Sequence, residues 1–163
     1  GCFGDGKEKN LMLFDGVTGA RTGTIDLGGL QGDHPDWSAD GKRIVFTDVG
    51  EFNTDQRSYK GAIAVVEQMG AGWSAPKNVI PRAGGKNHYY PAISPTNAFF
   101  VFNMSTCKSG DKGADCDFDM DPTAKIFAKF FDSDAPPVEL ANANGPGVAD
   151  NGKVELTNSF PKW

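Results

Sequence analysis

Short apolar runs separated by turn-forming residues recur along the whole chain. The stretch HPDWSADGKRIVFTD, residues 34–48, places a Ser-Ala-Asp-Gly turn segment before the apolar run Ile44, Val45 and Phe46. Apolar runs of this length, rich in β-branched and aromatic residues, are typical of strands, and no long helical period accompanies them. The 21 glycines and 10 prolines of the 163 residues fit many turns between such strands. The pattern therefore predicts an all-β protein.

The same stretch occurs a second time. YPAISPTNAFFVFNMS begins at Tyr90, and its Pro91 lies 56 residues after Pro35. A third copy begins with SFPKW, whose Pro161 lies 70 residues after Pro91. An internal repeat of this kind indicates one structural unit used several times.

Each copy predicts the same succession of elements. The proline begins a strand, the large apolar residue two places later (Trp37 or Ile93) is expected to pack between sheets, and Gly41 or Asn97 is expected to take a positive φ in the turn. Further strands are predicted at 62–66 and 125–130, and outer strands in PKNVIP and PPVELA. Four short antiparallel strands per unit are the pattern of a β-propeller blade.

The predicted domain organisation is one partial propeller over residues 1–163, with about two and a half blades. The segment NLMLFDGVTGARTGTIDL predicts a hairpin, which we interpret as the outer half of a preceding blade. The expected division is 1–31 for that half, 32–87 and 88–157 for two blades, and 158–163 for the start of another. Because propellers typically close with 4–8 blades, we expect further blades from the same chain or another chain.

The repeat resembles a known family. The pattern HPDWSADGKRIVF is similar to the Pro-Asp-Trp-Ser-Pro-Asp-Gly repeat of TolB-like propellers, a branch of the WD-type family. The second copy departs from it, since Ala92 and Thr96 stand where the family has aspartates. The resemblance implies a propeller that recognises proteins through one face or through its central channel.

Three functions follow as hypotheses. The first is a non-catalytic binding or scaffold propeller outside the cytoplasm. The second is the gating propeller of a prolyl-oligopeptidase-type serine peptidase, since the same repeats occur there; the G-x-S-x-G elbow of such a peptidase is absent from this sequence. The third is a calcium-dependent propeller that acts on carbohydrate.

Charge and hydropathy exclude two classes of partner. The net charge of −5 and the sequence pI near 4.9 argue against nucleic acid, which requires a basic surface. Mean hydropathy is −0.40 and no apolar run approaches the roughly 20 residues of a membrane-spanning helix. We therefore expect neither nucleic-acid binding nor a membrane span.

The three cysteines bear on the compartment. Cys107 and Cys116 flank the polar loop CKSGDKGADC and are predicted to form a disulfide, the alternative being two unrelated thiols. A disulfide implies the periplasm, the cell surface or the medium of a bacterium. Cys2 follows a glycine, as at a lipoprotein processing site; the alternative is a third thiol whose partner lies elsewhere.

The same loop carries alternating aspartates that suit a metal. Calcium takes six to eight oxygen ligands, which closely spaced carboxylates can provide. The spacing does not match an EF-hand loop, because Met120 and Ile126 stand where glycine and glutamate are needed. The alternative is a solvated acidic loop. The candidate calcium ligands are Asp115, Asp117, Asp119 and Asp121.

Candidate partner-binding residues lie in two connections. The segment 49–61 contains Phe52, Arg57 and Tyr59, which are residue types common at interface centres; the alternative is an ordinary hairpin insertion. His88 lies in GGKNHYYP, interpreted as a connection leading into a blade, where binding is an alternative to a structural role. His34 occupies the repeat position of Tyr90, which predicts aromatic packing.

Overall fold

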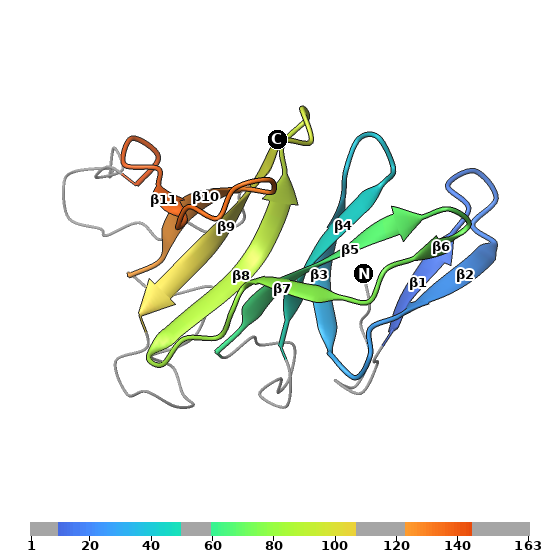
Figure 1. Ribbon diagram of the computed structural model, residues 1–163, viewed down its shortest axis with the longest axis horizontal. Helices are drawn as coiled ribbons and strands as arrows, with labels where there is room; N and C mark the ends of the chain where they lie inside the picture. Colours follow the sequence, from blue (N-terminus) through green and yellow to red (C-terminus); the bar gives the residue numbers. More distant parts are fainter. Residues whose placement is uncertain (1–9, 50–59, 107–122, 145–163) are drawn as a thin grey trace, which may run out of the picture.

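The computed structural model describes residues 10–49, 60–106 and 123–144, which form eleven strands and no helix (Figure 1). The strands are β1 (Asn10–Phe14), β2 (Arg21–Asp26), β3 (Gly32–Trp37), β4 (Arg43–Asp48), β5 (Ala62–Met69), β6 (Gly72–Trp73), β7 (Lys77–Ile80), β8 (Lys86–Ile93), β9 (Phe99–Thr106), β10 (Lys125–Phe130) and β11 (Val138–Glu139). The predicted all-β class is confirmed for these residues.

The strands form three antiparallel sheets of two, five and four strands. β1 pairs with β2, β3–β4–β5 form a sheet in which β6 and β7 both pair with β5, and β8 to β11 form the third sheet in sequence order. The predicted strands at 62–66 and 125–130 belong to β5 and β10, and the predicted outer strands are β7 and β11. The two-residue strand β6 was not predicted, since it is too short to leave an alternating pattern.

The second and third sheets contain two copies of one unit. We call β3, β4, β5 and β7 the first repeat unit and β8, β9, β10 and β11 the second. Trp37 pairs with Ile44 in the first, and Ile93 pairs with Phe100 in the second, each 56 residues later. The register of β4–β5 likewise recurs in β9–β10, and that of β5–β7 in β10–β11. The repeat seen in the sequence is therefore a repeat of hydrogen-bonded register.

The backbone irregularities also recur. A register shift interrupts β3 between Asp33 and Asp36, and β8 between Tyr89 and Ala92. Inside each shift one residue takes a positive φ: 46° at His34 and 50° at Tyr90. A bulge increases the local twist of a strand. The rings of His34 and Tyr90 meet edge to face, with centroids 4.3 Å apart, so His34 packs against an aromatic ring as the repeat predicted.

The turn between the first two strands of each unit has the expected geometry. Gly41 and Asn97 have φ values of 74° and 60°, and their amides donate to the carbonyls of Ser38 and Ser94 at 2.9 and 2.8 Å. The Ser38 hydroxyl additionally accepts the Arg43 amide at 2.9 Å. Only glycine and asparagine adopt this left-handed conformation routinely, so the sequence predicted both turn residues correctly.

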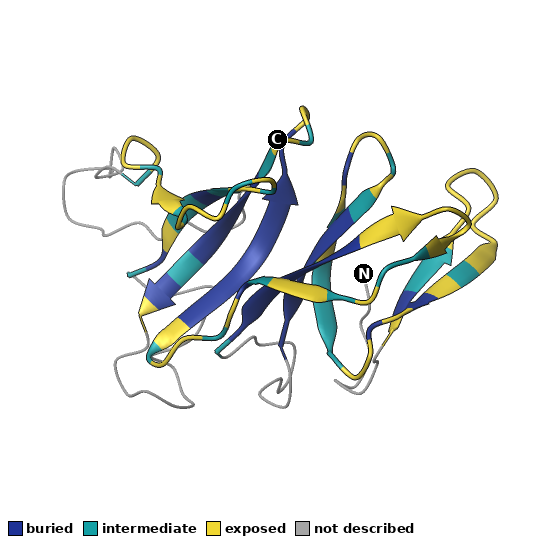
Figure 2. Cartoon of the chain, viewed as in Figure 1, coloured by how far each residue is buried: buried dark blue, intermediate teal, exposed yellow. Residues whose placement is uncertain are grey.

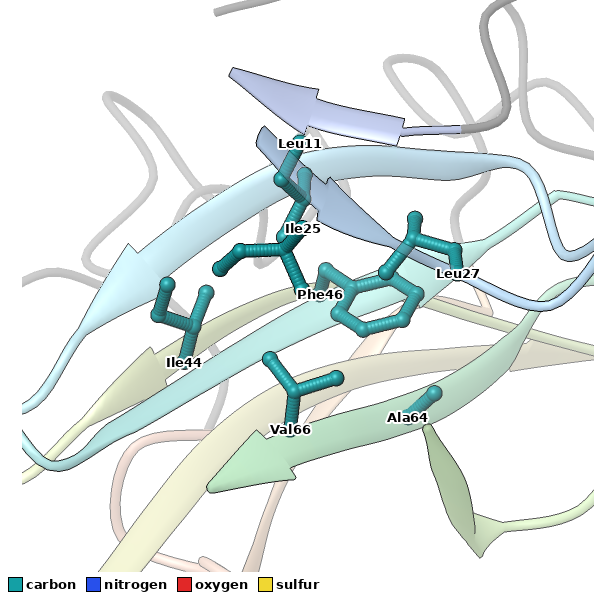
Figure 3. Packing of buried hydrophobic residues seen from close by; sticks show 7 residues of the cluster. All are labelled: Leu11, Ile25, Leu27, Ile44, Phe46, Ala64 and Val66. Atoms are coloured by element: carbon teal, nitrogen blue, oxygen red, sulfur yellow. The ribbon is translucent and has the colours of Figure 1, made fainter. Parts of the chain in front are cut away.

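Each sheet packs on its neighbour through alternating residues of one central strand. Ile44 and Phe46 of β4 face β1 and β2, where they meet Leu11, Ile25 and, directly after β2, Leu27 (Figure 3). Val45, between them, faces the other way and packs with Ile93, Phe100 and Phe102 of the second unit. Because side chains alternate along a strand, β4 is buried on both faces (Figure 2).

One packing prediction is wrong. Ile93 is buried between sheets at 5% exposure, but Trp37 at the equivalent position is 47% exposed, and its ring meets Trp73 edge to face at 5.8 Å between centroids. The two exposures differ because different strands lie beside the two units. Ile93 has the inner strands of the first unit beside it, whereas the described residues before Trp37 form only two strands, β1 and β2.

Candidate functional site

The long connections of both units leave from the same edge of their sheets. β4 ends at Asp48 and β5 begins at Ala62; in the second unit β9 ends at Thr106 and β10 begins at Lys125. Since the registers of the two units match, these strand ends lie at equivalent places, along the lower edge in Figure 1. We call this the insertion edge, and it includes the β7–β8 connection that runs between the units.

Most of the predicted site residues belong to these two connections. Phe52, Arg57 and Tyr59 lie between β4 and β5, and the aspartates and two cysteines lie between β9 and β10. All of them, and Cys2, lie outside the described residues, so the binding, calcium and disulfide predictions stay predictions. Of the predicted partner-binding, calcium-binding and disulfide residues, His88 is the one that lies among the described residues. The structure does describe the residues from which the connections depart.

An arginine holds the end of β4 and the approach to β5 together. Arg82 forms an ion pair with the Asp48 carboxylate at 2.7 Å, and the Asp48 side chain is only 2% exposed. The same guanidinium donates to the backbone carbonyls of Lys60, at 2.6 Å, and Asp48, at 3.0 Å. Arginine suits this task because its planar fork presents several fixed donors. The two ends of the first long connection are thereby fixed to the β7–β8 connection.

A second clamp ties the start of β5 to the second unit. The Gly61 amide donates to Oδ1 of Asn87 at 2.8 Å, and the Gly61 carbonyl lies 3.0 Å from Nδ1 of His88. Because a carbonyl only accepts, Nδ1 carries the proton in this contact. Asn87 and His88 are both buried, at 0% and 4% exposure. The position of Gly61 is thus set by side chains of β8.

His88 lies in a strand and not in a connection, which corrects its predicted placement. It is the third residue of β8, and its ring meets Phe102 edge to face at 6.0 Å between centroids. Burial lowers the pKa of the His88 imidazole below its ordinary value; the hydrogen bond to Gly61 opposes this shift and the positive charge of Lys86 adds to it. The neutral imidazole is therefore the form that the fold favours.

We expect the stability of the fold to depend on this histidine as pH falls. Below about pH 6.5 the unfolded chain takes up a proton on His88 that the folded chain resists, so the free energy of unfolding decreases with a slope of up to about 1.4 kcal/mol per pH unit. Urea titrations between about pH 5 and 8 measure this slope.

Variants of the two histidines test whether His88 causes this pH dependence of stability. His88→Asn keeps an amide that can donate to Gly61; it should lower stability at neutral pH and remove the slope. His34→Asn, at a positive φ that asparagine tolerates, should keep the slope. Equal slopes in the wild type and in His88→Asn would contradict the assignment.

The opposite edge is also joined across the units, by residues that the sequence analysis did not single out as contacts. The Asp36 carboxylate accepts the Ile93 amide at 2.7 Å, and Oδ1 of Asn97 accepts the Ala39 amide at 2.9 Å. Asp36 is the aspartate of the Pro-Asp-Trp-Ser segment, so its place in the repeat could have signalled this role. The second unit has Ala92 there and lacks the carboxylate.

The described residues offer no alternative metal site. No group of three or more histidine, cysteine, aspartate or glutamate side chains able to hold a metal occurs within residues 10–49, 60–106 and 123–144. The same part of the chain contains no helix long and apolar enough to cross a membrane. Neither finding bears on the acidic segment between β9 and β10.

Comparison of the sequence with protein-family models and with curated proteins found no match. The resemblance to TolB-like propellers therefore rests on the repeated residues themselves and stays a prediction. The structure shows in addition that the repeated residues have the same strand pairing in both units.

Proposed function

We propose that the chain is part of a β-propeller and that its insertion edge binds a protein partner without catalysing a reaction. The observation that carries this proposal is the repeated unit: two consecutive four-stranded arrangements share their registers, and the second packs on the first. Radial repetition of such sheets leaves only short, protected strand edges, which is the principle of a propeller.

The surroundings of Trp37 support further blades in the ring. If two inner strands of another unit lay beside β3, they would cover Trp37 as the first unit covers Ile93. An exposed tryptophan at a repeat position that is buried in the next unit marks a surface that another unit fits. We propose that such blades come from the same chain or from another chain.

The insertion edge is suited to present binding residues because its supports are rigid. Arg82 holds both ends of the connection that contains Phe52, Arg57 and Tyr59, and Asn87 and His88 hold Gly61 at its end. Binding residues act best on segments positioned by a rigid scaffold. We therefore assign partner recognition to this connection, with His88 as a supporting residue rather than a contact.

Two further parts of the proposal rest on the connection between β9 and β10. A Cys107–Cys116 disulfide would place the protein in the periplasm, at the cell surface or in the medium. Calcium held by Asp115, Asp117, Asp119 and Asp121 would be its one cofactor. Neither is required for partner binding at the other connection.

The test compares two edges of the same protein. We expect the triple variant Phe52→Ala, Arg57→Ala, Tyr59→Ala to lose at least about tenfold in affinity for a partner captured by the wild-type protein, since central aromatic and arginine residues carry most interface energy. A matched double variant at the opposite edge, Val17→Ser with Lys42→Ala, should keep the affinity.

The measurement is quantitative affinity capture from an extracytoplasmic extract, followed by titration of the purified partner. Retention of the same partner by the triple variant, with unchanged affinity, would contradict the assignment to this edge. Loss of affinity in both variants would also contradict the assignment, because the effect would not be specific to the insertion edge.

A further inference from the structure

A groove with a volume of about 580 Å³ lies between the two repeat units, on the side of their outer strands. One wall is β7 of the first unit; the other is formed by β9, β10 and the segment 131–137 of the second. The groove shares Pro81 and Ala83 of the β7–β8 connection with the insertion edge, but its described lining contains no residue of the connection between β4 and β5, to which we assign partner binding. Its volume falls within the roughly 300–1,000 Å³ of small-molecule sites.

Phenylalanines form the apolar part of this groove. Phe100 and Phe102 are fully buried at its base, and their rings lie 5.1 Å from Phe131 and 6.0 Å from Phe127, between centroids. Phe130, also in the lining, is 54% exposed. Binding sites for small molecules are lined mainly by aromatic and aliphatic groups of this kind, with a few polar groups for orientation.

The charged groups that the structure describes in the groove are mainly cationic. Among the described residues, its lining contains Lys77, Lys86 and Lys129 and one acidic residue, Asp134. The Lys129 ammonium is held by the carbonyls of Ser133 and Ala135, which ties the 131–137 segment to β10. Lys77 and Lys86 make no ion pair with any described residue. Two lysines are therefore available to an anion.

This local charge contrasts with that of the whole chain. The protein carries a net charge of −5, so a lysine-bordered groove is a departure from its average surface. His88 contributes no charge here when neutral, and it lies at the inner wall beside Phe102. A site with an apolar base and cationic border favours ligands that combine an apolar body with a negative group.

We propose that the groove binds a small amphipathic carboxylate, with its apolar body against the phenylalanines and its carboxylate near Lys77 and Lys86. An ammonium binds a carboxylate through charge-assisted hydrogen bonds, and an apolar chain or ring gains by leaving water for the phenylalanine surfaces. This ligand site is independent of the proposed partner binding.

The experiment is calorimetric titration of the whole protein with three probes of equal chain length. Decanoate should bind with one-to-one stoichiometry and at least about tenfold more tightly than decanol, with decyltrimethylammonium the weakest; tenfold corresponds to about 1.4 kcal/mol. All three are used below their micellar concentrations. Saturable binding of decanoate at one site is the first requirement.

Variants distinguish the contribution of the lysines from that of the phenylalanines. The double variant Lys77→Gln, Lys86→Gln should reduce the preference for decanoate over decanol to less than about threefold, while Lys42→Gln in the β3–β4 turn should leave it unchanged. Phe130→Ser should weaken decanoate and decanol alike. Because these side chains are exposed, thermal unfolding of each variant verifies that the fold is retained.

Four results would overturn the proposal, and the first three concern the decyl probes. They are the absence of saturable decanoate binding, equal affinity for the three probes, and a preference that survives the double lysine variant. A fourth, binding of an acidic peptide but not of decanoate, would identify a polypeptide site and also reject it. The Phe52, Arg57, Tyr59 variant should bind decanoate normally, so failure here is distinguishable from failure of the proposed function.

Discussion

Replacing Gly61 with alanine is expected to lower the free energy of unfolding by about 3 kcal/mol. A Cβ at this position would lie 2.3 Å from the backbone carbonyl oxygen of His88, and 3.2 Å from Oδ1 of Asn87. No side-chain rotation relieves the first contact, since both atoms are fixed by their backbones. The sheets must therefore separate locally, and the hydrogen bonds of Gly61 to Asn87 and His88 weaken with that movement.

Gly84→Ala is the matched control. A Cβ on Gly84 meets no atom within 4 Å, and its φ is not in the left-handed region. Its effect should stay within about 0.5 kcal/mol, or be slightly stabilising because alanine restricts the unfolded chain. Urea unfolding followed by tryptophan fluorescence measures both. If Gly61→Ala and Gly84→Ala lowered the free energy of unfolding by similar amounts, the close approach of the second repeat unit would not be the reason that position 61 requires glycine.

Replacing Arg82 with methionine is expected to destabilise the protein by about 3 kcal/mol. The substitution keeps the length and the apolar stem of the side chain, but it removes the cation that lies 2.7 Å from the buried Asp48 carboxylate. It also removes donors from the carbonyls of Lys60 and Asp48. Breaking a buried ion pair from one side costs more than removing it entirely, because the remaining charge has lost its solvation.

Two comparisons test that reasoning. The double variant Arg82→Met, Asp48→Asn should recover part of the loss, since the buried carboxylate charge is gone while the two carbonyls still lack the arginine donors. Glu67→Gln removes the partner of Arg43 in an exposed ion pair of 2.8 Å, and should cost less than about 1 kcal/mol. If Arg82→Met cost no more than Glu67→Gln, the Arg82 clamp would not fix the ends of the connection.

Most of the strands, and the turns, were predictable because their causes are local; β6 was too short to predict, and Pro35 and Pro91 lie inside β3 and β8 where they were expected to begin a strand. An alternating or continuous apolar run between turn residues specifies a strand, and Gly41 and Asn97 specify the left-handed turn position whatever surrounds them. The equivalence of residues 34–48 and 90–105 was visible for the same reason. Matching local patterns produce matching registers, including the bulge at His34 and Tyr90.

The environment of each repeat position was not predictable in the same way. Trp37 and Ile93 occupy equivalent positions, yet one is half-exposed and the other buried. Comparing the sequences of the two copies cannot reveal that difference, because the exposure of each residue depends on which strands lie next to its unit. Asp36 was visible as a motif residue, but its use as an acceptor for the Ile93 amide requires the second unit to pack against the first.

The sequence by itself determined most of the strands, the turns and the existence of a repeated unit. Each strand and turn follows from a pattern within about fifteen residues, and the repeat follows from the match between two such patterns. Only the tertiary structure decided which groups meet between units: Gly61 with His88, 27 residues away, and Arg82 with Asp48, 34 residues away. It also decided that Lys77 of β7 and Phe127 of β10 border one groove. Such pairs form because sheets stack at a fixed distance and register, and single-strand patterns carry no information about the facing sheet.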